Sequence, residues 1–340
     1  MQLVILYQSL RFGVHLCNNM GDMWGESARV AVVIPCFKAA RHVRAVVEGI
    51  PAWVDAVVVV DDACPQGSGD VAAEAGRPGL EVIRHERNQG VGGAVASGYA
   101  HALALGADVI VKMDGDGQMD PAQLERLVAP VAEGSADYAK GNRFGAFESL
   151  KAMPPVRLAG NSILSFLVKA ASGYWDVLDP TNGYTAIHRD ALAKLDFKRI
   201  AKGYFFETDM LINLYLCGAA VTDVDIPARY GDEESALNPG RAAVEFIPKL
   251  AKGFLRRVAL RYFVRDFNMA SVYLLLGLPL FAFGLGFGAM EWADSIATGE
   301  PKSAGTIMLA ALPLIVSFQM LLQAVQIDMG NVPRKKPPHH

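Results

Sequence analysis

The 340-residue chain has only four cysteines, Cys17, Cys36, Cys64 and Cys217, and none of them form a pair at a metal-ligand spacing. This scarcity argues against both a disulfide framework and a structural zinc site, and it is typical of thiols in a reducing compartment. Residues 1–27 also lack the small-residue cleavage site that ends a secretory signal. We therefore expect them to be an N-terminal extension and not a signal peptide.

Excess positive charge is also missing, because the formal net charge is −3. A nucleic-acid partner is therefore disfavoured. Apolar residues, in contrast, make up 52% of the chain, and they are concentrated in two runs almost free of charge, 269–290 and 306–325. At about 1.5 Å per residue the first run would form a helix of roughly 33 Å, enough for the hydrocarbon core of a bilayer. We expect two transmembrane helices within 268–327, and the alternative is a buried hairpin of a soluble protein.

Charges beside these runs predict their orientation. Residues 241–267 combine apolar positions at near-helical spacing with Lys and Arg, which is typical of an amphipathic helix lying on a membrane surface. The tail 328–340 is also basic, whereas the loop between the runs is mainly acidic. The positive-inside rule then places both termini in the cytoplasm, and an integral protein of the cytoplasmic membrane is expected. Two spans and a surface helix fit a homo-oligomer without requiring one.

Residues 28–240 alternate predicted strands and helices. The strands are expected at 30–34, 56–60, 81–84 and 109–113, with helical patterns near 39–49, 91–105 and 121–131. Such alternation predicts an α/β domain with a mostly parallel, Rossmann-like sheet. Ligands of these sheets bind outside the carboxyl ends of the strands. Polar residues follow four of the expected strands, so we expect one ligand site at that edge.

Asp114 and Asp116 follow the fourth expected strand. In an extended segment residues two apart point the same way, so both carboxylates can face one hard cation, Mg²⁺ or Mn²⁺. The alternative is a solvated Asp/Gly turn. Asp61 and Asp62, after the second strand, can accept hydrogen bonds from a base or a ribose, or form an Asx turn. A tight turn at Asn88–Gly93 suits close approach of a nucleotide, but a dehydrogenase would carry it directly after the first strand.

Several motifs occur together, in a fixed order, between residues 30 and 235. They are Val32-Val-Ile-Pro35-Cys-Phe37, Val60-Asp-Asp62, Asn88-Gln-Gly90-Val-Gly-Gly93, Asp114-Gly-Asp116-Gly-Gln-Met-Asp120-Pro121, Gly141-Asn-Arg143, Asp179-Pro-Thr-Asn-Gly183-Tyr184 and Tyr230-Gly-Asp-Glu-Glu-Ser235. In this order they resemble a family 2 glycosyltransferase with the GT-A nucleotide-sugar fold, similar to the polyprenyl-phosphate synthases of the dolichol-phosphate mannose type.

The resemblance implies a role for each matching residue. The implied ligands of the nucleotide sugar, a UDP- or GDP-hexose, are Pro35, Phe37, Asp61, Asp62, Asn88, Gly90, Gly93, Asp114 and Gln118. A metal is implied at Asp114 and Asp116, and catalytic roles at Asp116, Arg143, Asp179 and Asp209. Arg143 and Arg157 are candidates for holding the phosphate of a polyprenyl phosphate, because guanidinium groups match phosphate oxygens.

Alternatives remain for individual residues and for the acceptor. Arg157 fits a solvated helix face equally well, and Asp209 fits a favourable charge at a helix N-terminus. Phe37 is followed by Lys38 where the family carries an Asn and acids, and Ala63-Cys64 stand where it carries Gly-Ser, which puts base recognition in doubt. No Gln-x-x-Arg-Trp element occurs, which argues for transfer of one hexose. The alternative acceptors are a diacylglycerol or a growing glycan, and the alternative function is non-catalytic nucleotide binding.

Overall fold

The computed structural model describes residues 28–143, 155–227 and 239–335. Seven strands in that part of the chain form one mixed sheet with the order β3-β2-β1-β4-β6-β5-β7. The chain divides into two compact units. The first unit comprises residues 1–139, 183–193 and 228–231, and the second comprises 140–182, 194–227 and 232–340. The predicted α/β class is confirmed.

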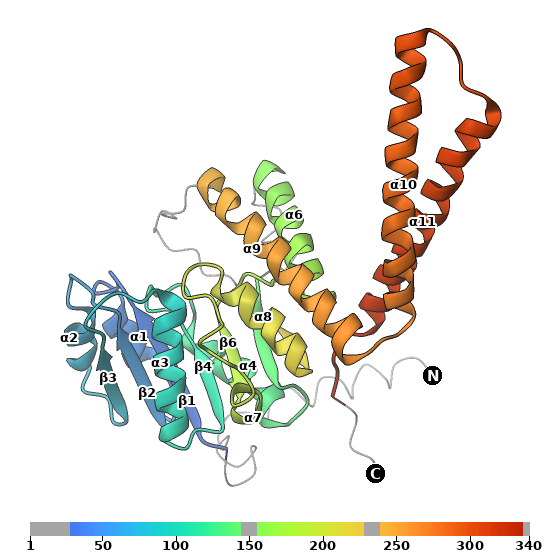
Figure 1. Cartoon of the computed structure of the whole chain (residues 1–340). Helices are drawn as coiled ribbons and strands as arrows, with labels where there is room; N and C mark the ends of the chain where they lie inside the picture. The colour runs from blue at the N-terminus through green and yellow to red at the C-terminus, as the bar shows by residue number, and fades with distance from the viewer. Residues whose placement is uncertain (1–27, 144–154, 228–238, 336–340) are drawn as a thin grey trace, which may run out of the picture. The chain divides into compact units, whose positions relative to one another are not determined.

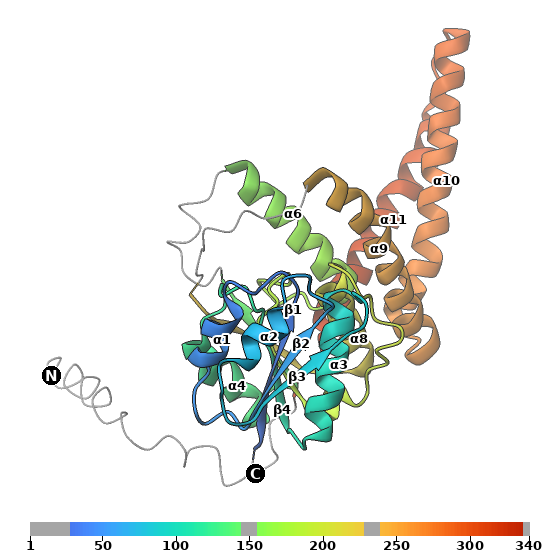
Figure 2. The same cartoon turned by 90° about the vertical axis from the view of Figure 1, so that its left-hand side faces the viewer.

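The first unit contains the parallel part of the sheet. Its elements are β1 (Val30–Cys36), α1 (Val43–Gly49), β2 (Ala56–Asp61), α2 (Ser68–Ala73), β3 (Leu80–Arg84), α3 (Val91–Ala104), β4 (Val109–Lys112), η2 (Pro121–Gln123), α4 (Leu124–Ala132), β6 (Thr185–His188) and α7 (Arg189–Leu192). β1 pairs in parallel with β2 and β4, β2 with β3, and β6 runs antiparallel to β4. Figure 2 shows α3 on one face of these strands and α1, α2 and α4 on the other.

These strands form because valine and isoleucine favour extended backbone and are buried here on both faces. All four central residues of β2, Val57 to Val60, are fully buried. α3 approaches them closely at Gly98, because a Cβ there would overlap Val33 of β1. The helix therefore packs directly on the strands, which fixes the position of its N-terminus at the carboxyl edge of the sheet.

The second unit is mainly helical. β5 (Tyr138–Asn142) begins in the first unit and ends here, followed by α6 (Pro155–Ser172), α8 (Phe206–Cys217), β7 (Val221–Asp225), α9 (Pro239–Ala259), the π-helical segment η3 (Leu260–Arg265), α10 (Met269–Thr298) and α11 (Ala304–Gly330). α6 and α9 lie side by side, and α10 and α11 form a hairpin (Figure 1).

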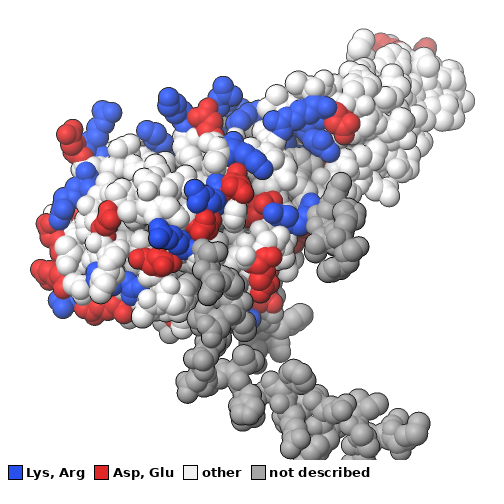
Figure 3. Space-filling model, turned by 90° about the horizontal axis from the view of Figure 1, so that it is seen from below, with Lys and Arg blue, Asp and Glu red and all other residues white. Residues whose placement is uncertain are grey.

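The hairpin matches the two expected spans, with helices longer than the apolar runs. The most apolar 18-residue stretches of α10 and α11 have a mean hydropathy of 1.9 and 2.0. Only 11% of the first stretch and 6% of the second is buried in this structure. The described residues therefore leave most of both helices uncovered, unlike the alternative of a buried hairpin in a soluble protein. In Figure 3 the hairpin surface is almost free of charge apart from acidic residues at its far end. Both helices are long and apolar enough to cross a membrane.

The expected amphipathic helix is present, but its apolar residues divide into two groups. Leu250 is buried, and the ring of Phe246 packs against Phe205 at a centroid distance of 5.0 Å. Ile247 and Leu255 are exposed, at 57% and 65%. One side of α9 therefore packs against protein, while a second apolar side remains uncovered. The helix also ends at Ala259, earlier than expected, because the chain continues as a π-helical turn.

Candidate active site

Asp61 ends β2, and its carboxylate shapes the loop that follows. Oδ1 accepts the backbone N–H of Cys64 at 2.7 Å, and Oδ2 accepts that of Gly69 at 2.7 Å. A Cβ on Gly69 would lie 2.7 Å from Oδ2, so only glycine permits this approach. Asp61 is 7% exposed. Both carboxylate oxygens thus serve the loop backbone, as in the turn alternative considered for this residue.

Asp62 anchors the turn before α3. Its carboxylate accepts the N–H of Gln89 and that of Gly90, both at 2.8 Å, and contacts His85 Nδ1 at 2.7 Å. The other ring nitrogen of His85 lies 2.9 Å from Ser97 Oγ. His85 was missed from the sequence. Its position beside the Asn88 motif was the available signal.

The glycine turn at the start of α3 is tight, and its predicted approach to a nucleotide stays a prediction. Asn88 Oδ1 accepts the N–H of Gly90 at 3.0 Å, and Gly90 has φ of +80°, which favours glycine. At Gly93 a Cβ would lie 2.6 Å from Gln89 Cβ. A side chain at position 93 would overlap Gln89, so glycine is required here in the first turn of α3.

The loop after β1 presents an exposed aromatic ring. Pro35 lies within β1, and Phe37 directly after it is 46% exposed. Lys38 Nζ lies 5.5 Å from the centroid of that ring. The N–H of Lys38 donates to Cys64 Sγ at 3.1 Å, which ties this loop to the loop after β2. A base could stack on such a ring.

The two carboxylates of the Asp-Gly-Asp motif have different surroundings. Asp114 Oδ1 lies 2.8 Å from Nζ of Lys112, whose side chain is 2% exposed. Asp116 is partly exposed, and its Oδ1 accepts the N–H of Gln118 at 3.0 Å. From the sequence we expected both acids at one metal, with Asp114 also at the nucleotide sugar. The pair of Asp114 with a buried ammonium group was not expected, and the sequence signals it only as a charge inside an apolar strand.

These acids form a partial set of metal ligands. Among the described residues no group of three His, Cys, Asp or Glu side chains is placed to hold a metal. Carboxylate oxygens are nevertheless the donors that Mg²⁺ and Mn²⁺ prefer, and Mg²⁺ usually binds through one or two carboxylates together with substrate phosphates. The donor set at Asp114 and Asp116 therefore fits a cation that shares its ligands with a diphosphate.

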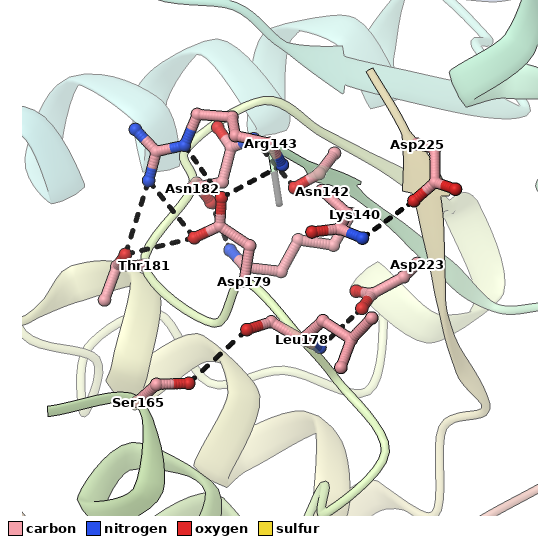
Figure 4. A network of polar contacts seen from close by, with 11 residues as sticks. Lys140, Asn142, Arg143, Ser165, Leu178, Asp179, Thr181, Asn182, Asp223 and Asp225 are labelled. Atoms are coloured by element: carbon pink, nitrogen blue, oxygen red, sulfur yellow. Dashed lines mark hydrogen bonds and ion pairs between the residues drawn. The ribbon is translucent and has the colours of Figure 1, made fainter. Parts of the chain in front are cut away.

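In the second unit, a buried carboxylate holds an arginine (Figure 4). Asp179 is fully buried and accepts hydrogen bonds from Arg143 Nε at 2.7 Å and Nη2 at 3.1 Å. Thr181 Oγ1 also donates to Asp179, at 3.2 Å. The Arg143 side chain is 42% exposed. This bidentate pair fixes the guanidinium plane while leaving part of it open to an anion.

A polar network holds the loop that carries Asp179 (Figure 4). Asn182 Nδ2 donates to the carbonyl of Gly141 at 2.7 Å, and the buried Lys140 ammonium donates to the carbonyl of Asn182. Next to Asp179, the N–H of Leu178 donates to Asp223 Oδ2 at 2.5 Å. The loop is thus bound at both ends, so the position of Arg143 depends on the strands β5 and β7.

Asp223 is the one of these acids with a strongly perturbed carboxyl group. Burial and the nearby charge of Asp179 together raise its pKa to about 6, against the opposing effects of the Leu178 N–H, Lys140 and Lys169. Its buried Oδ1 has no hydrogen-bond partner among the described residues. An unpartnered buried oxygen favours the neutral, protonated form.

Asp209 lies in the first turn of α8 and is 8% exposed. Its Oδ2 accepts the N–H of Ala201 at 2.8 Å, and Asn213 Nδ2 donates to Oδ1 at 3.2 Å. Asn213 Oδ1 in turn accepts Arg256 Nη2 at 2.8 Å. Burial raises the pKa of Asp209, against the hydrogen bond from Ala201 and the charge of Arg256. These contacts connect Asp209 to the basic helix α9.

Two predicted elements cannot be placed. Arg157 lies on α6, but its side chain is outside the described residues, as is the motif Tyr230-Ser235.

A second buried ion pair, absent from the predictions, connects the hairpin to the rest of the second unit. Asp328, near the end of α11, accepts Arg257 Nη1 at 2.7 Å and Nη2 at 2.9 Å, Tyr262 Oη at 2.6 Å and Trp175 Nε1 at 2.8 Å. Arg257 is fully buried and also donates to the carbonyls of Ala170 and Ala171 in α6. α6, α9 and α11 therefore meet at one charge pair.

Residues 31–196 match the model of glycosyl transferase family 2. The chain is 35% identical over 173 residues to an undecaprenyl-phosphate mannosyltransferase of Micrococcus luteus, covering 50% of this chain and 70% of that protein. It is 29% identical over 198 residues to a UDP-N-acetylglucosamine–dolichyl-phosphate N-acetylglucosaminyltransferase of Methanococcus voltae, covering 54% and 78%.

A solved structure, the glucosyl-3-phosphoglycerate synthase of M. tuberculosis, aligns with a TM-score of 0.50 and 20% identity, covering 67% of this chain and 81% of that one. At this identity the likeness concerns the fold alone, and it agrees with the α/β sheet described above. The ordered motifs, the sheet and the similarity to these relatives lead to one conclusion: the chain belongs to glycosyl transferase family 2.

Proposed function

We propose that this protein transfers a single hexose from a nucleotide sugar to a polyprenyl phosphate at the cytoplasmic face of the membrane, with inversion at the anomeric carbon. The observation that carries this proposal is the combination of two features in one chain. The family 2 part resembles relatives named for undecaprenyl-phosphate and dolichyl-phosphate acceptors, and it is followed by two helices that could span a membrane. A water-soluble acceptor would not explain the two helices that could span a membrane.

The donor-binding groups belong to the first unit. The exposed ring of Phe37 can stack on the base, and the turn at Asn88–Gly93 brings backbone N–H groups close to the nucleotide. Asp61 and Asp62 support this role by fixing the two loops, and Gln118 is exposed beside Asp116. Side-chain contacts of Asp61 and Asp62 with the base are not required.

Asp116 would hold Mg²⁺ or Mn²⁺ together with the diphosphate, and Asp114 would complete the site from its pair with Lys112. When bound, the cation would neutralise charge that develops on the leaving nucleoside diphosphate. The bond from the anomeric carbon to that diphosphate breaks as a phosphate oxygen of the acceptor forms the new bond. Because this oxygen is already anionic, no general base is needed.

The acceptor-binding groups belong to the second unit. Arg143, held by Asp179, offers the free part of its guanidinium to the lipid phosphate, and Arg157 of α6 is a further candidate for the same anion. Asp179 therefore acts as a positioning residue. Asp209 is also assigned a positioning role. Its carboxylate accepts a hydrogen bond from Asn213, which in turn accepts one from Arg256.

A membrane topology completes the proposal. Lys and Arg gather next to the start of the hairpin, and acids lie at its far end (Figure 3). The positive-inside rule then favours cytoplasmic termini, with the uncovered apolar side of α9 in the inner leaflet. This arrangement would keep Arg143 on the side of the membrane where nucleotide sugars occur.

The test uses full-length protein in detergent with undecaprenyl phosphate, Mg²⁺ or Mn²⁺, and UDP-glucose, UDP-N-acetylglucosamine, UDP-galactose or GDP-mannose offered separately. A lipid carrying one sugar, detected by mass spectrometry and lost in Asp116→Asn and with chelator, is expected. The matched control is Asp120→Asn, because the Asp120 carboxylate caps η2. This variant should retain product formation. If nucleotide and metal bind but no lipid product forms, the acceptor is wrong. Diacylglycerol, a glycan or simple nucleotide binding would then take its place.

A further inference from the structure

Lys112 is an unusual residue for the centre of a sheet. It ends β4, which lies between β1 and β6, and it is 1% exposed. Burying an ammonium group is costly unless an opposite charge compensates. The compensating charge is Asp114, 2.8 Å away, whose own side chain is 31% exposed. One face of Asp114 is therefore occupied from inside the protein, and the other faces solvent.

Gly183 closes the space around this pair. A Cβ at position 183 would overlap Lys112 Nζ and lie 3.1 Å from Asp114 Oδ2. The backbone of this loop thus lies directly against the ammonium group. A side chain at position 183 would displace the ammonium group, so the Lys112–Asp114 pair requires glycine there.

The pair changes the charge of the candidate metal site. Asp114 and Asp116 together carry two negative charges, and Lys112 returns one positive charge, which leaves a net −1. The described residues also supply no third acidic, His or Cys ligand. A divalent cation binds more weakly to a site whose negative charge is reduced in this way, and phosphates and water would complete its set of oxygen ligands.

We propose that Lys112 is a positioning residue that neutralises Asp114, so that the divalent cation enters together with the nucleotide diphosphate and not before it. This inference rests on the proposed function for its ligand, a nucleoside diphosphate. In this inference Lys112 lowers the affinity for the metal alone relative to the affinity for the metal with the donor. Gly183 leaves the room that the Lys112 ammonium group occupies.

The experiment measures free Mn²⁺ by electron paramagnetic resonance with the full-length protein in detergent, first without nucleotide and then with UDP or GDP. The variants are Lys112→Met, Asp114→Asn and the double variant, with Lys112→Arg retaining the charge. Arg84→Gln removes a positive charge from an exposed pair with Asp70 and is the matched control. Lys112→Met, which leaves a net −2, should bind Mn²⁺ alone about ten-fold more tightly. Asp114→Asn should bind it more weakly than wild type, and the double variant should return close to wild type.

Each outcome decides a separate point. Nucleotide-independent affinities that stay equal across the series, while nucleotide still binds, overturn the inference and leave the proposed function standing. Tight binding of Mn²⁺ alone to the wild type also overturns it. The reverse result, an ordered charge series without any nucleotide binding, would support the charge role of Lys112 and reject both co-entry and the proposed function. Asp114→Asn gives an independent answer if Lys112→Met does not fold.

Discussion

Four of the buried carboxylates are used in two different ways. In the first unit Asp61 and Asp62 accept backbone N–H groups, and so determine the shape of loops. In the second unit Asp179 and Asp328 accept arginine side chains, and so determine where a positive charge lies. The first arrangement builds a surface from main chain. The second fixes charges suited to an anionic acceptor and to a membrane anchor.

The largest expected change in stability follows from breaking the Arg257–Asp328 pair. Arg257→Met leaves Asp328 buried without its main partner, and breaking a buried pair on one side costs about 3 to 5 kcal/mol. We expect much lower thermal stability in detergent. The double variant Arg257→Met/Asp328→Leu removes both charges and should recover most of the loss. If both variants are equally unstable, packing and not charge holds this junction.

A smaller effect is expected in the first unit. Asp62→Ala removes the acceptor of two backbone N–H groups and of His85, and we expect destabilisation of roughly 2 to 3 kcal/mol together with a raised KM for the nucleotide sugar. Asp62→Asn keeps one acceptor oxygen, so its stability and its KM for the nucleotide sugar should lie between those of wild type and Asp62→Ala. An unchanged KM for the donor would separate this loop from nucleotide binding.

Asp179→Asn tests the acceptor half. The loss of its charge weakens the hold on Arg143 without removing the guanidinium, so the KM for lipid phosphate should rise roughly 10- to 100-fold. Binding of the nucleotide sugar should be unaffected, as measured by calorimetry. Thr181→Val, which removes only the minor hydrogen bond to Asp179, is the milder control. A change confined to donor binding would contradict the assignment.

The smallest effect concerns Asp223, whose pKa is raised to about 6. Because the folded state holds this proton more tightly than the unfolded state, its contribution to stability is complete below about pH 4 and is lost as the pH rises through 6. Asp223→Asn should therefore be more stable than wild type at pH 7, by roughly 1 to 2 kcal/mol. Thermal midpoints from pH 4 to 8 measure this, and parallel curves for the two proteins would refute it.

The sequence predicted the parallel strands well because their valine runs are buried on both faces. The four expected strands agree with β1 to β4 within about two residues, the usual uncertainty of such boundaries. β5, β6 and β7 were not predicted. β5 contains the buried polar residues Lys140 and Asn142, and β6 runs antiparallel, so neither follows the pattern of a continuous apolar strand.

From the sequence we named site residues without their contacts, and the roles of those residues remain predictions. The motifs located Asp61, Asp62 and Asp114, but partners such as His85 and Lys112 come from tertiary packing. An alternation pattern reports which residues are buried and not which charges meet. Arg257 was assigned to a basic membrane surface for the same reason, and the structure buries it completely.

The Arg257–Asp328 pair also sets the order of events during synthesis. Asp328 follows Arg257 by 71 residues, and at translation rates of about 5 to 20 residues per second it is made roughly 4 to 14 s later. Until then Arg257 lacks the partner that allows its burial between α6 and α9. The second unit therefore completes its fold only after the hairpin has been made. A newly synthesised chain would meet its lipid acceptor with the anchor already in place.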